Sequence, residues 1–156
     1  MSYFLPNFRI IVCTQKKLPL LESFDFIERC STEDELLLKL AENTESVRIL
    51  ACSQEIFLNL PKESIPPNLE TIYCISDLSN TIDSFEIIEK NAQITKVSNE
   101  NDLVLNLLFK VILAYYSQSQ KYQKDAEQSV ANSCILIALE TINQIKTNRD
   151  AFCPSL

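Results

Sequence analysis

Five short segments rich in apolar and β-branched residues alternate with helix-like segments over about the first hundred residues of this chain. These strand-like segments are Phe8–Thr14, Phe24–Cys30, Val47–Ser53, Leu69–Ser76 and Gln93–Ser98. Parallel strands need a crossover connection, and a helix commonly supplies it. We therefore predict an α/β protein with a five-stranded, doubly wound parallel sheet in the order 2-1-3-4-5, built as a three-layer sandwich.

Helical patterns fill the connections and the end of the chain. STEDELLLKLAEN, from Ser31, combines capping hydroxyls with an acidic first turn and an apolar face. QEIFLNLPKES predicts a short helix that ends near Pro61, and another is expected from Asp83 or Ser84. A helix from residue 99 to about residue 117, a polar break at SQSQKYQKD and a last amphipathic helix over about 125–146 complete the prediction.

The chain contains neither histidine nor glycine. Without imidazole there is no Ser–His or Cys–His dyad and no histidine metal ligand. Without glycine the phosphate-binding loops of P-loop and Rossmann proteins are excluded, because their backbones must approach the phosphates closely. Helices must also end on a residue other than glycine, and Asn43, Asn91 and Asn148 are the candidates.

Charge and hydropathy limit the partners of the chain. The net charge of −7 argues against binding nucleic acid or anionic membranes. The longest apolar run, LVLNLLFKVILAYY, contains Lys110 and is too short to span a bilayer. The first twenty residues show no signal-peptide pattern, so we expect reduced thiols and a cytoplasmic or nuclear location. We expect no cofactor, no nucleic-acid partner and no membrane partner.

Two segments of the chain nearly repeat each other: RIIVCTQ from Arg9 and RILACSQ from Arg48, with a looser echo in ETIYCISD. They place Cys13, Cys52 and Cys74 near the carboxyl ends of three predicted strands, where α/β sheets carry their chemistry. Cysteine is also a common small core residue, so packing is the simpler interpretation. A redox-active thiol pair and a soft-metal site are the alternatives. The chain has no CxxC pair, so no metal site is predicted.

The order of elements over residues 7–117 resembles the receiver domains of two-component signalling. Receivers carry an acidic pair at the end of the first strand and a phosphoacceptor aspartate at the end of the third. Those positions hold Cys13, Thr14 and Cys52 here. The resemblance therefore implies a degenerate receiver-like domain that works without phosphorylation, because no carboxylate is available to hold magnesium or accept a phosphoryl group.

Other receiver positions are occupied by residues of the expected type. Ser76 matches the hydroxyl residue that closes the fourth strand, and Lys96 matches the lysine that closes the fifth, although Val97 replaces the proline that usually follows. Together with Thr14 and Ser53, they imply a receiver-like polar corner that is either a solvated rim or a residual ligand site.

A fainter likeness covers residues 15–97. A strand ending in serine, a short helix, a proline and then LETIYCIS is similar to the region before the catalytic domain of animal arginine ADP-ribosyltransferases that carry tetratricopeptide repeats. That likeness implies an accessory region without transferase activity.

The helix around Leu103–Tyr116 is apolar over more than one stripe, which is typical of a helix covered on several sides. Either the last helix covers its outer face within one chain, or the last two helices form a self-association surface. Receivers often dimerise through the corresponding helix, so the resemblance favours self-association. The predicted interface residues are Leu108, Val111, Ile112, Tyr115, Tyr116, Tyr122 and Ile137.

We therefore predict a non-catalytic protein–protein interaction or regulatory signalling module that forms a homodimer. Residues 1–120 would be the receiver-like domain and residues 121–156 a helical extension. A cysteine-dependent redox sensor or enzyme that uses the strand-end thiols is the main alternative. An acidic adaptor that captures a basic peptide is a third interpretation, based on net charge alone.

Overall fold

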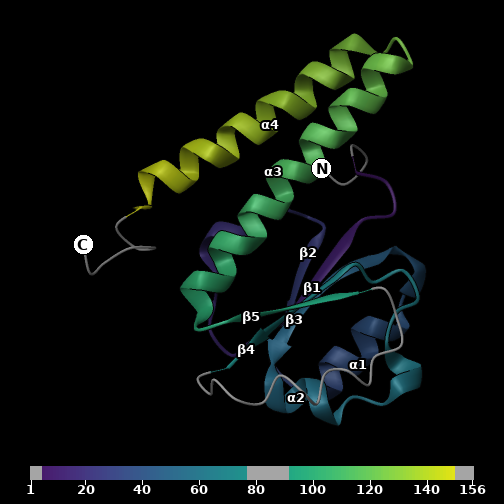
Figure 1. Ribbon diagram of the computed structural model, residues 1–156, viewed down its shortest axis with the longest axis vertical. Helices are drawn as coiled ribbons and strands as arrows, with labels where there is room; N and C mark the ends of the chain where they lie inside the picture. Colours follow the sequence, from purple (N-terminus) through teal and green to yellow (C-terminus); the bar gives the residue numbers. More distant parts are fainter. Residues whose placement is uncertain (1–4, 77–91, 150–156) are drawn as a thin grey trace. The chain divides into compact units, whose positions relative to one another are not determined.

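The computed structural model describes residues 5–76 and 92–149 (Figure 1). The chain divides into two compact units, one of Asn7–Leu103 and one that combines Met1–Pro6 with Val104–Leu156. The boundary expected between residues 120 and 121 falls inside a continuous helix. The helix expected from Asp83 or Ser84 and the cap expected at Asn91 lie outside the described residues.

The first unit contains a five-stranded parallel sheet. Its strands are β1 (Arg9–Cys13), β2 (Ile27–Cys30), β3 (Val47–Ser53), β4 (Thr71–Ile75) and β5 (Gln93–Val97). They are ordered β2-β1-β3-β4-β5, and every neighbouring pair is parallel. The predicted fold class, a doubly wound α/β sheet in the order 2-1-3-4-5 with helices at the C-terminal end of the chain, is confirmed.

Burial along the strands explains this order. Ile10, Ile11 and Val12 of β1 are almost fully buried in succession, as are Leu50 and Ala51 of β3. Strands covered on both faces read as continuous apolar runs, which is why RIIVC and RILAC occupy the centre of the sheet. The edge strands β2 and β5 are more polar and only partly buried.

Two helices cover one face of the sheet (Figure 1). They are α1 (Glu33–Ala41) and α2 (Gln54–Asn59), and the 3₁₀ turns η2 (Pro19–Leu21), η3 (Thr44–Ser46) and η4 (Lys62–Ser64) complete the connections. The N-cap hydroxyls of Thr32 and Ser53 each accept a backbone hydrogen bond of 3.2 Å from the first turn of their helix. Both helices contribute to one apolar core with the strands, through side chains that include Leu36, Leu40 and Phe57.

Asparagine replaces glycine after α1. Asn43 follows the C-cap residue with φ 49° and ψ 49°, in the left-handed region that asparagine tolerates better than most residues. This confirms Asn43 as a substitute for glycine. Asn148 caps the last helix of the described chain with φ −104°, outside the left-handed region.

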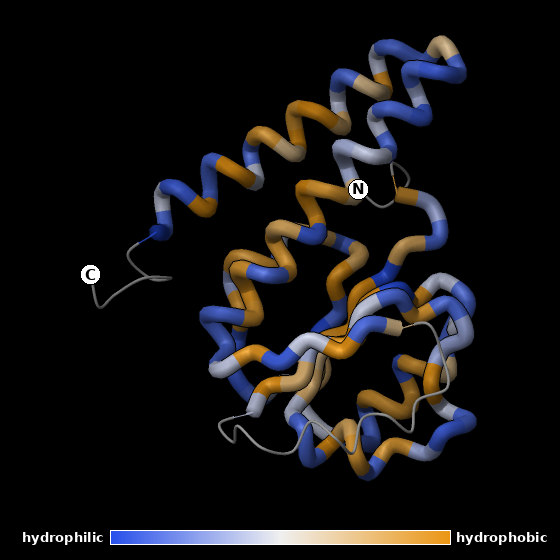
Figure 2. Tube along the Cα trace, in the orientation of Figure 1, coloured by the Kyte–Doolittle hydropathy of each residue, from blue (hydrophilic) through white to orange (hydrophobic). Residues whose placement is uncertain are grey.

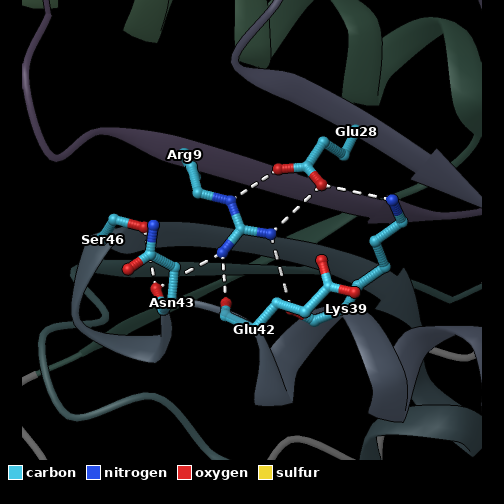
Figure 3. Close-up of polar contacts among 6 residues, drawn as sticks. All are labelled: Arg9, Glu28, Lys39, Glu42, Asn43 and Ser46. Atoms are coloured by element: carbon cyan, nitrogen blue, oxygen red, sulfur yellow. Dashed lines mark hydrogen bonds and ion pairs between the residues drawn. The ribbon is translucent and has the colours of Figure 1, made fainter.

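Arg9 ties three elements of the sheet unit together (Figure 3). Its guanidinium donates to both carboxylate oxygens of Glu28 on β2 and to the backbone carbonyl oxygens of Lys39, Glu42 and Asn43 at the end of α1. Lys39 adds an ion pair with Glu28 at 3.3 Å. A cation is favoured at a helix C-terminus because the last carbonyl groups carry partial negative charge.

Glu28 should make the stability of the protein depend on pH. Burial raises its pKa, but the hydrogen bonds and positive charges of Arg9 and Lys39 outweigh this and hold the pKa below the ordinary value of 4.5. A carboxyl group with a lowered folded-state pKa stabilises the fold above its unfolded-state pKa and loses that contribution as pH falls through the folded-state pKa. We expect the free energy of unfolding to fall more steeply below about pH 5 in the wild type than in Glu28→Gln.

Urea unfolding followed by circular dichroism between neutral and acid pH would measure this difference. Equal pH dependence in the two proteins would contradict it, because Glu28→Gln cannot titrate at this position.

Two long helices follow the sheet in the chain, α3 (Glu100–Lys124) and α4 (Gln128–Thr147), and the second unit contains α4 and the part of α3 from Val104 onward. They form a helical hairpin (Figure 1). The end of α3 has the hydrogen bonds of a Schellman motif, Ala126 N–H to Gln123 at 3.1 Å and Glu127 N–H to Tyr122 at 2.8 Å. Ala126 takes the left-handed position with φ 61°, where glycine is the usual residue.

The polar break predicted after residue 117 is wrong, because α3 continues through SQSQKYQK. Figure 2 shows hydrophilic residues along this end of the helix. Glutamine and lysine are good helix formers, and the segment contains no proline. Ser119 is buried and donates from its hydroxyl to the Tyr116 carbonyl oxygen at 2.6 Å. Within residues 5–76 and 92–149, no helix is long and apolar enough to cross a membrane.

Candidate functional site

Four cysteines form one row across four adjacent strands. Cys30 of β2 is in register with Cys13 of β1, and Cys52 of β3 is in register with Cys74 of β4. Val12 of β1 is in register with Ala51 of β3. Cys13 and Cys52 are the next residues on these two central strands. Register partners point to the same face of a sheet. The row therefore runs Cys30–Cys13–Cys52–Cys74, and all four residues belong to the core that α1 and α2 cover.

Cys30 was not among the residues that the sequence singled out. It ends the segment FDFIERC, just as Cys13 ends its own strand. Its position at a strand end was visible, but its pairing with Cys13 depends on the register between β1 and β2. A sequence pattern alone does not contain that register.

The row lies inside the core. Cys13 and Cys30 are 3% and 2% exposed, and Cys52 and Cys74 are 0% exposed. All four are free thiols. The Cys13 thiol donates to the Thr32 carbonyl oxygen at 3.6 Å, and the Cys30 thiol donates to the Val12 carbonyl oxygen at 3.7 Å. This arrangement is typical of packed thiols and unlike an open catalytic cleft.

The surroundings shift the pKa values of these thiols in different directions. Burial raises the pKa of Cys74 to about 12, and burial together with the neighbouring thiols raises the pKa of Cys52 well above its ordinary value. The interaction between Cys13 and Cys30, followed by burial, raises the pKa of Cys30. The same interaction lowers the pKa of Cys13, although burial and the charge of Glu35 oppose it. Only the Cys13 member of the row is thus shifted toward the thiolate.

The predicted receiver-like polar corner is built mainly from local interactions. Thr14 is buried, its hydroxyl oxygen accepts from the Lys16 N–H at 3.3 Å, and its carbonyl oxygen accepts from Arg29 at 2.8 Å. The Ser53 hydroxyl oxygen caps α2 by accepting from the Ile56 N–H. Both hydroxyl oxygens are thus engaged within their own turns.

Ser76 and Lys96 lie on the β4–β5 side of the sheet. The Ser76 N–H donates to the Val97 carbonyl oxygen at 3.0 Å, which extends the strand pairing by one residue. Lys96 is in register with Cys74, so these two side chains point to the same face of the sheet. In the part of the chain that the structure describes, no group of three or more cysteine, aspartate or glutamate side chains could hold a metal ion.

A second candidate site is an apolar surface on the helical hairpin. We define the hairpin face as Phe109, Leu113 and Tyr116 of α3 with Leu136 and Leu139 of α4. Their exposed fractions are 51%, 61%, 55%, 62% and 55%. Residues spaced by three or four lie on one side of a helix, so each helix contributes one exposed apolar stripe.

The two stripes lie at the same level of the hairpin. Tyr116 and Leu136 are each ten residues from Ala126, and Leu113 and Leu139 are each thirteen residues from it. Residues equally distant from the turn lie opposite each other in an antiparallel helix pair.

Each exposed stripe lies beside a buried residue of its own helix. At this level each helix buries the residue before an exposed one, Tyr115 before Tyr116 and Ala138 before Leu139. Tyr116 and Leu139 each lie directly beside the buried stripe of their own helix.

The predicted interface residues divide into three groups. Leu108, Val111 and Tyr115 are buried within the chain, whereas Ile112, Tyr122 and Ile137 are half-buried. Tyr116 alone among the seven is exposed and belongs to the hairpin face. Sequence reasoning missed the other four members of the face, because the side of each helix that stays exposed depends on tertiary packing. The available signal was the run of small residues in α4, which includes Ala131, Cys134 and Ala138.

The sheet order and the strand-end row place the chain in the class of doubly wound α/β proteins. Comparisons with protein-family models, with curated proteins and with solved structures find no match. The likeness to receiver domains and the fainter likeness to the ADP-ribosyltransferase region therefore stay predictions from the sequence.

Proposed function

We propose that this protein is a non-catalytic interaction module that forms a homodimer through the hairpin face. The observation that carries the proposal is the exposure of five large apolar side chains on one helical hairpin, each by at least 51%. Removing apolar surface from water is favourable by about 25 cal/mol per Å². A contiguous apolar patch on a protein surface commonly marks an interaction site.

The composition of the hairpin face favours a second copy of the chain as its partner. The five residues are uncharged and include two aromatic residues, which suits the centre of an interface. Exposed amide side chains of Gln120, Asn132 and Asn143 continue the same helical stripes as a polar rim. In a twofold dimer the same patch meets itself, and a neutral apolar patch is complementary to itself. The acidic net charge of −7 is instead contributed by residues outside the face.

The side chains at the strand ends support the non-catalytic part of this proposal. The positions where the receiver resemblance would require carboxylates hold the buried thiols of Cys13 and Cys52. The hydroxyl oxygens of Thr14 and Ser53 are engaged in local turns. A receiver-like domain of this kind would regulate other proteins by binding them. A homodimer would present two copies of each binding surface.

The double substitution Leu113→Glu/Leu139→Glu should dissociate the dimer. Each glutamate places a charge at the centre of the hairpin face, where it would be desolvated on association. We expect the dissociation constant to rise by about 100-fold or more. Sedimentation velocity over a range of protein concentrations would measure it, with circular dichroism to verify folding.

Leu38→Glu is the matched control. Leu38 is 68% exposed but lies on α1, outside the hairpin. The control should dimerise like the wild type. A wild-type protein that stays monomeric at all concentrations, or a double variant that stays dimeric, would refute the proposal.

A further inference from the structure

We propose that Cys13 and Cys30 are a reversible disulfide site that joins the edge strand β2 to the central strand β1. The two residues are register partners on adjacent parallel strands, and both side chains point into the same core. Neighbouring strands lie about 4.8 Å apart, which is within the range of Cα separations that disulfides bridge. The proposal does not depend on the hairpin face.

Among the neighbouring pairs of the row, Cys13 and Cys30 are the pair at the edge of the sheet, and beyond the strand ends one backbone hydrogen bond of 2.9 Å joins the Thr14 N–H to the Cys30 carbonyl oxygen. Both are the last residues of their strands. Cys52 and Cys74, by contrast, are followed by the paired residues Ser53 and Ile75 and are fully buried between central strands. Forming a disulfide requires a small approach of the two backbones, and strand ends permit this more readily than strand interiors.

The surroundings also distinguish a nucleophile from its partner. The Cys13 thiol lies beside the N-terminus of α1, at 3.6 Å from the carbonyl oxygen of the N-cap residue Thr32. The helix N-terminus favours a thiolate at Cys13, whereas the Thr32 carbonyl oxygen, which accepts from this thiol, favours the protonated form. The pKa of Cys13 is lowered by its interaction with Cys30, against the opposing effects of burial, Glu35 and Glu33. We assign Cys13 as the attacking thiol and Cys30 as the resolving thiol, because Cys13 is the one that lies beside the N-terminus of α1.

The oxidant in this proposal is a hydroperoxide, with hydrogen peroxide as the simplest member. The Cys13 thiolate attacks one peroxide oxygen, the O–O bond breaks, and the leaving hydroxide takes up the proton released by Cys13 to form water. The Cys30 sulfur then attacks the sulfenic sulfur of Cys13, the S–O bond breaks, and the Cys30 proton leaves with the hydroxyl as a second water. Two thiols lose two electrons in total, and one peroxide becomes two waters.

Access to the pair depends on the edge of the sheet. β2 has four residues and lies at one edge of the sheet, where local opening costs less free energy than at the centre, although the contacts of Glu28 with Arg9 and Lys39 oppose it. Such opening exposes Cys30 and Cys13 without disturbing the fully buried Cys52 and Cys74. The disulfide would then hold β2 closed.

The test treats the full reduced chain with hydrogen peroxide under native conditions. Free thiols are then blocked by alkylation, and the protein is digested and analysed by mass spectrometry. We expect a peptide pair linked through Cys13 and Cys30 that dithiothreitol separates. We also expect amide hydrogen exchange in β2 to slow by about tenfold in the oxidised protein.

Two variants sharpen the result. Cys30→Ala should accumulate a sulfenic acid at Cys13 that dimedone traps, whereas Cys74→Ala should form the same Cys13–Cys30 link as the wild type. A folded wild-type protein that forms no such link, or that links Cys13 to another cysteine instead, would overturn the proposal. The sedimentation behaviour of the hairpin variants is a separate measurement, so failure of one proposal does not decide the other.

Discussion

Replacing Cys52 with aspartate is expected to lower the free energy of unfolding by at least about 4 kcal/mol. Aspartate is the residue that the receiver resemblance would place here, so the substitution tests whether the position is an open site or part of the core. Cys52 is 0% exposed and lies among apolar side chains and the thiols of Cys13 and Cys74. A carboxylate at this position would be desolvated by the surrounding core.

The neighbouring substitution Ser53→Asp is the matched control. Ser53 is half-buried and caps α2, and aspartate caps a helix about as well as serine. The control should change the free energy of unfolding by less than about 0.5 kcal/mol. Both values can be measured by urea unfolding at neutral pH.

The pH dependence of Cys52→Asp provides a second check. Burial should raise the folded-state pKa of the new carboxyl group, so the loss of stability is largest above that pKa and shrinks as pH falls toward the unfolded-state value. A Cys52→Asp protein with wild-type stability and affinity for magnesium would instead show that the receiver site is open.

Arg9→Met should lower the free energy of unfolding by about 2–3 kcal/mol. The Arg9 side chain is 14% exposed, and its loss would remove the hydrogen bonds to Glu28 and to the carbonyl groups at the end of α1. Glu28 would keep only its ion pair with Lys39. Methionine preserves much of the aliphatic packing, so the loss reports mainly on the polar network.

Arg48→Met is the control for this prediction, because Arg48 occupies the same place in the near-repeat RILACSQ. Its Nε donates one exposed hydrogen bond of 3.1 Å to the Asn7 carbonyl oxygen. The control should cost less than about 0.5 kcal/mol. Thermal and urea unfolding would compare the free energies of unfolding of the two variants. Equal losses would show that the Arg9 network contributes no more stability than the single exposed hydrogen bond of Arg48.

The sheet was predictable because its signals are local. Continuous apolar runs such as RIIVC and RILAC indicate strands buried on both faces, and the helix-like connections require parallel pairing. The length of α3 was less accessible. Its polar last turns resemble a loop in composition, and they are helical because good helix formers follow an established helix without a breaker.

The candidate sites depended on contacts that a sequence pattern does not specify. Cys13, Cys52 and Cys74 were recognisable as strand-end residues, but Cys30 became their neighbour only through the β1–β2 register. The apolar surplus of α3 was also visible in the sequence. The side of α3 that stays exposed, with Phe109 and Leu113, depends on tertiary packing that a sequence pattern does not specify.

The left-handed residue between α3 and α4 has a consequence for how the hairpin holds together. An alanine at φ 61° costs about 1–2 kcal/mol relative to a relaxed backbone, and glycine would avoid most of this cost. The left-handed conformation of Ala126 therefore adds a free-energy cost to the turn that reverses the chain. The hydrogen bonds of the turn, from the Ala126 N–H to Gln123 and from the Glu127 N–H to Tyr122, offset part of this cost. The remainder must be offset by side-chain burial along the helices, to which the buried Ala131, Cys134 and Ala138 of α4 contribute.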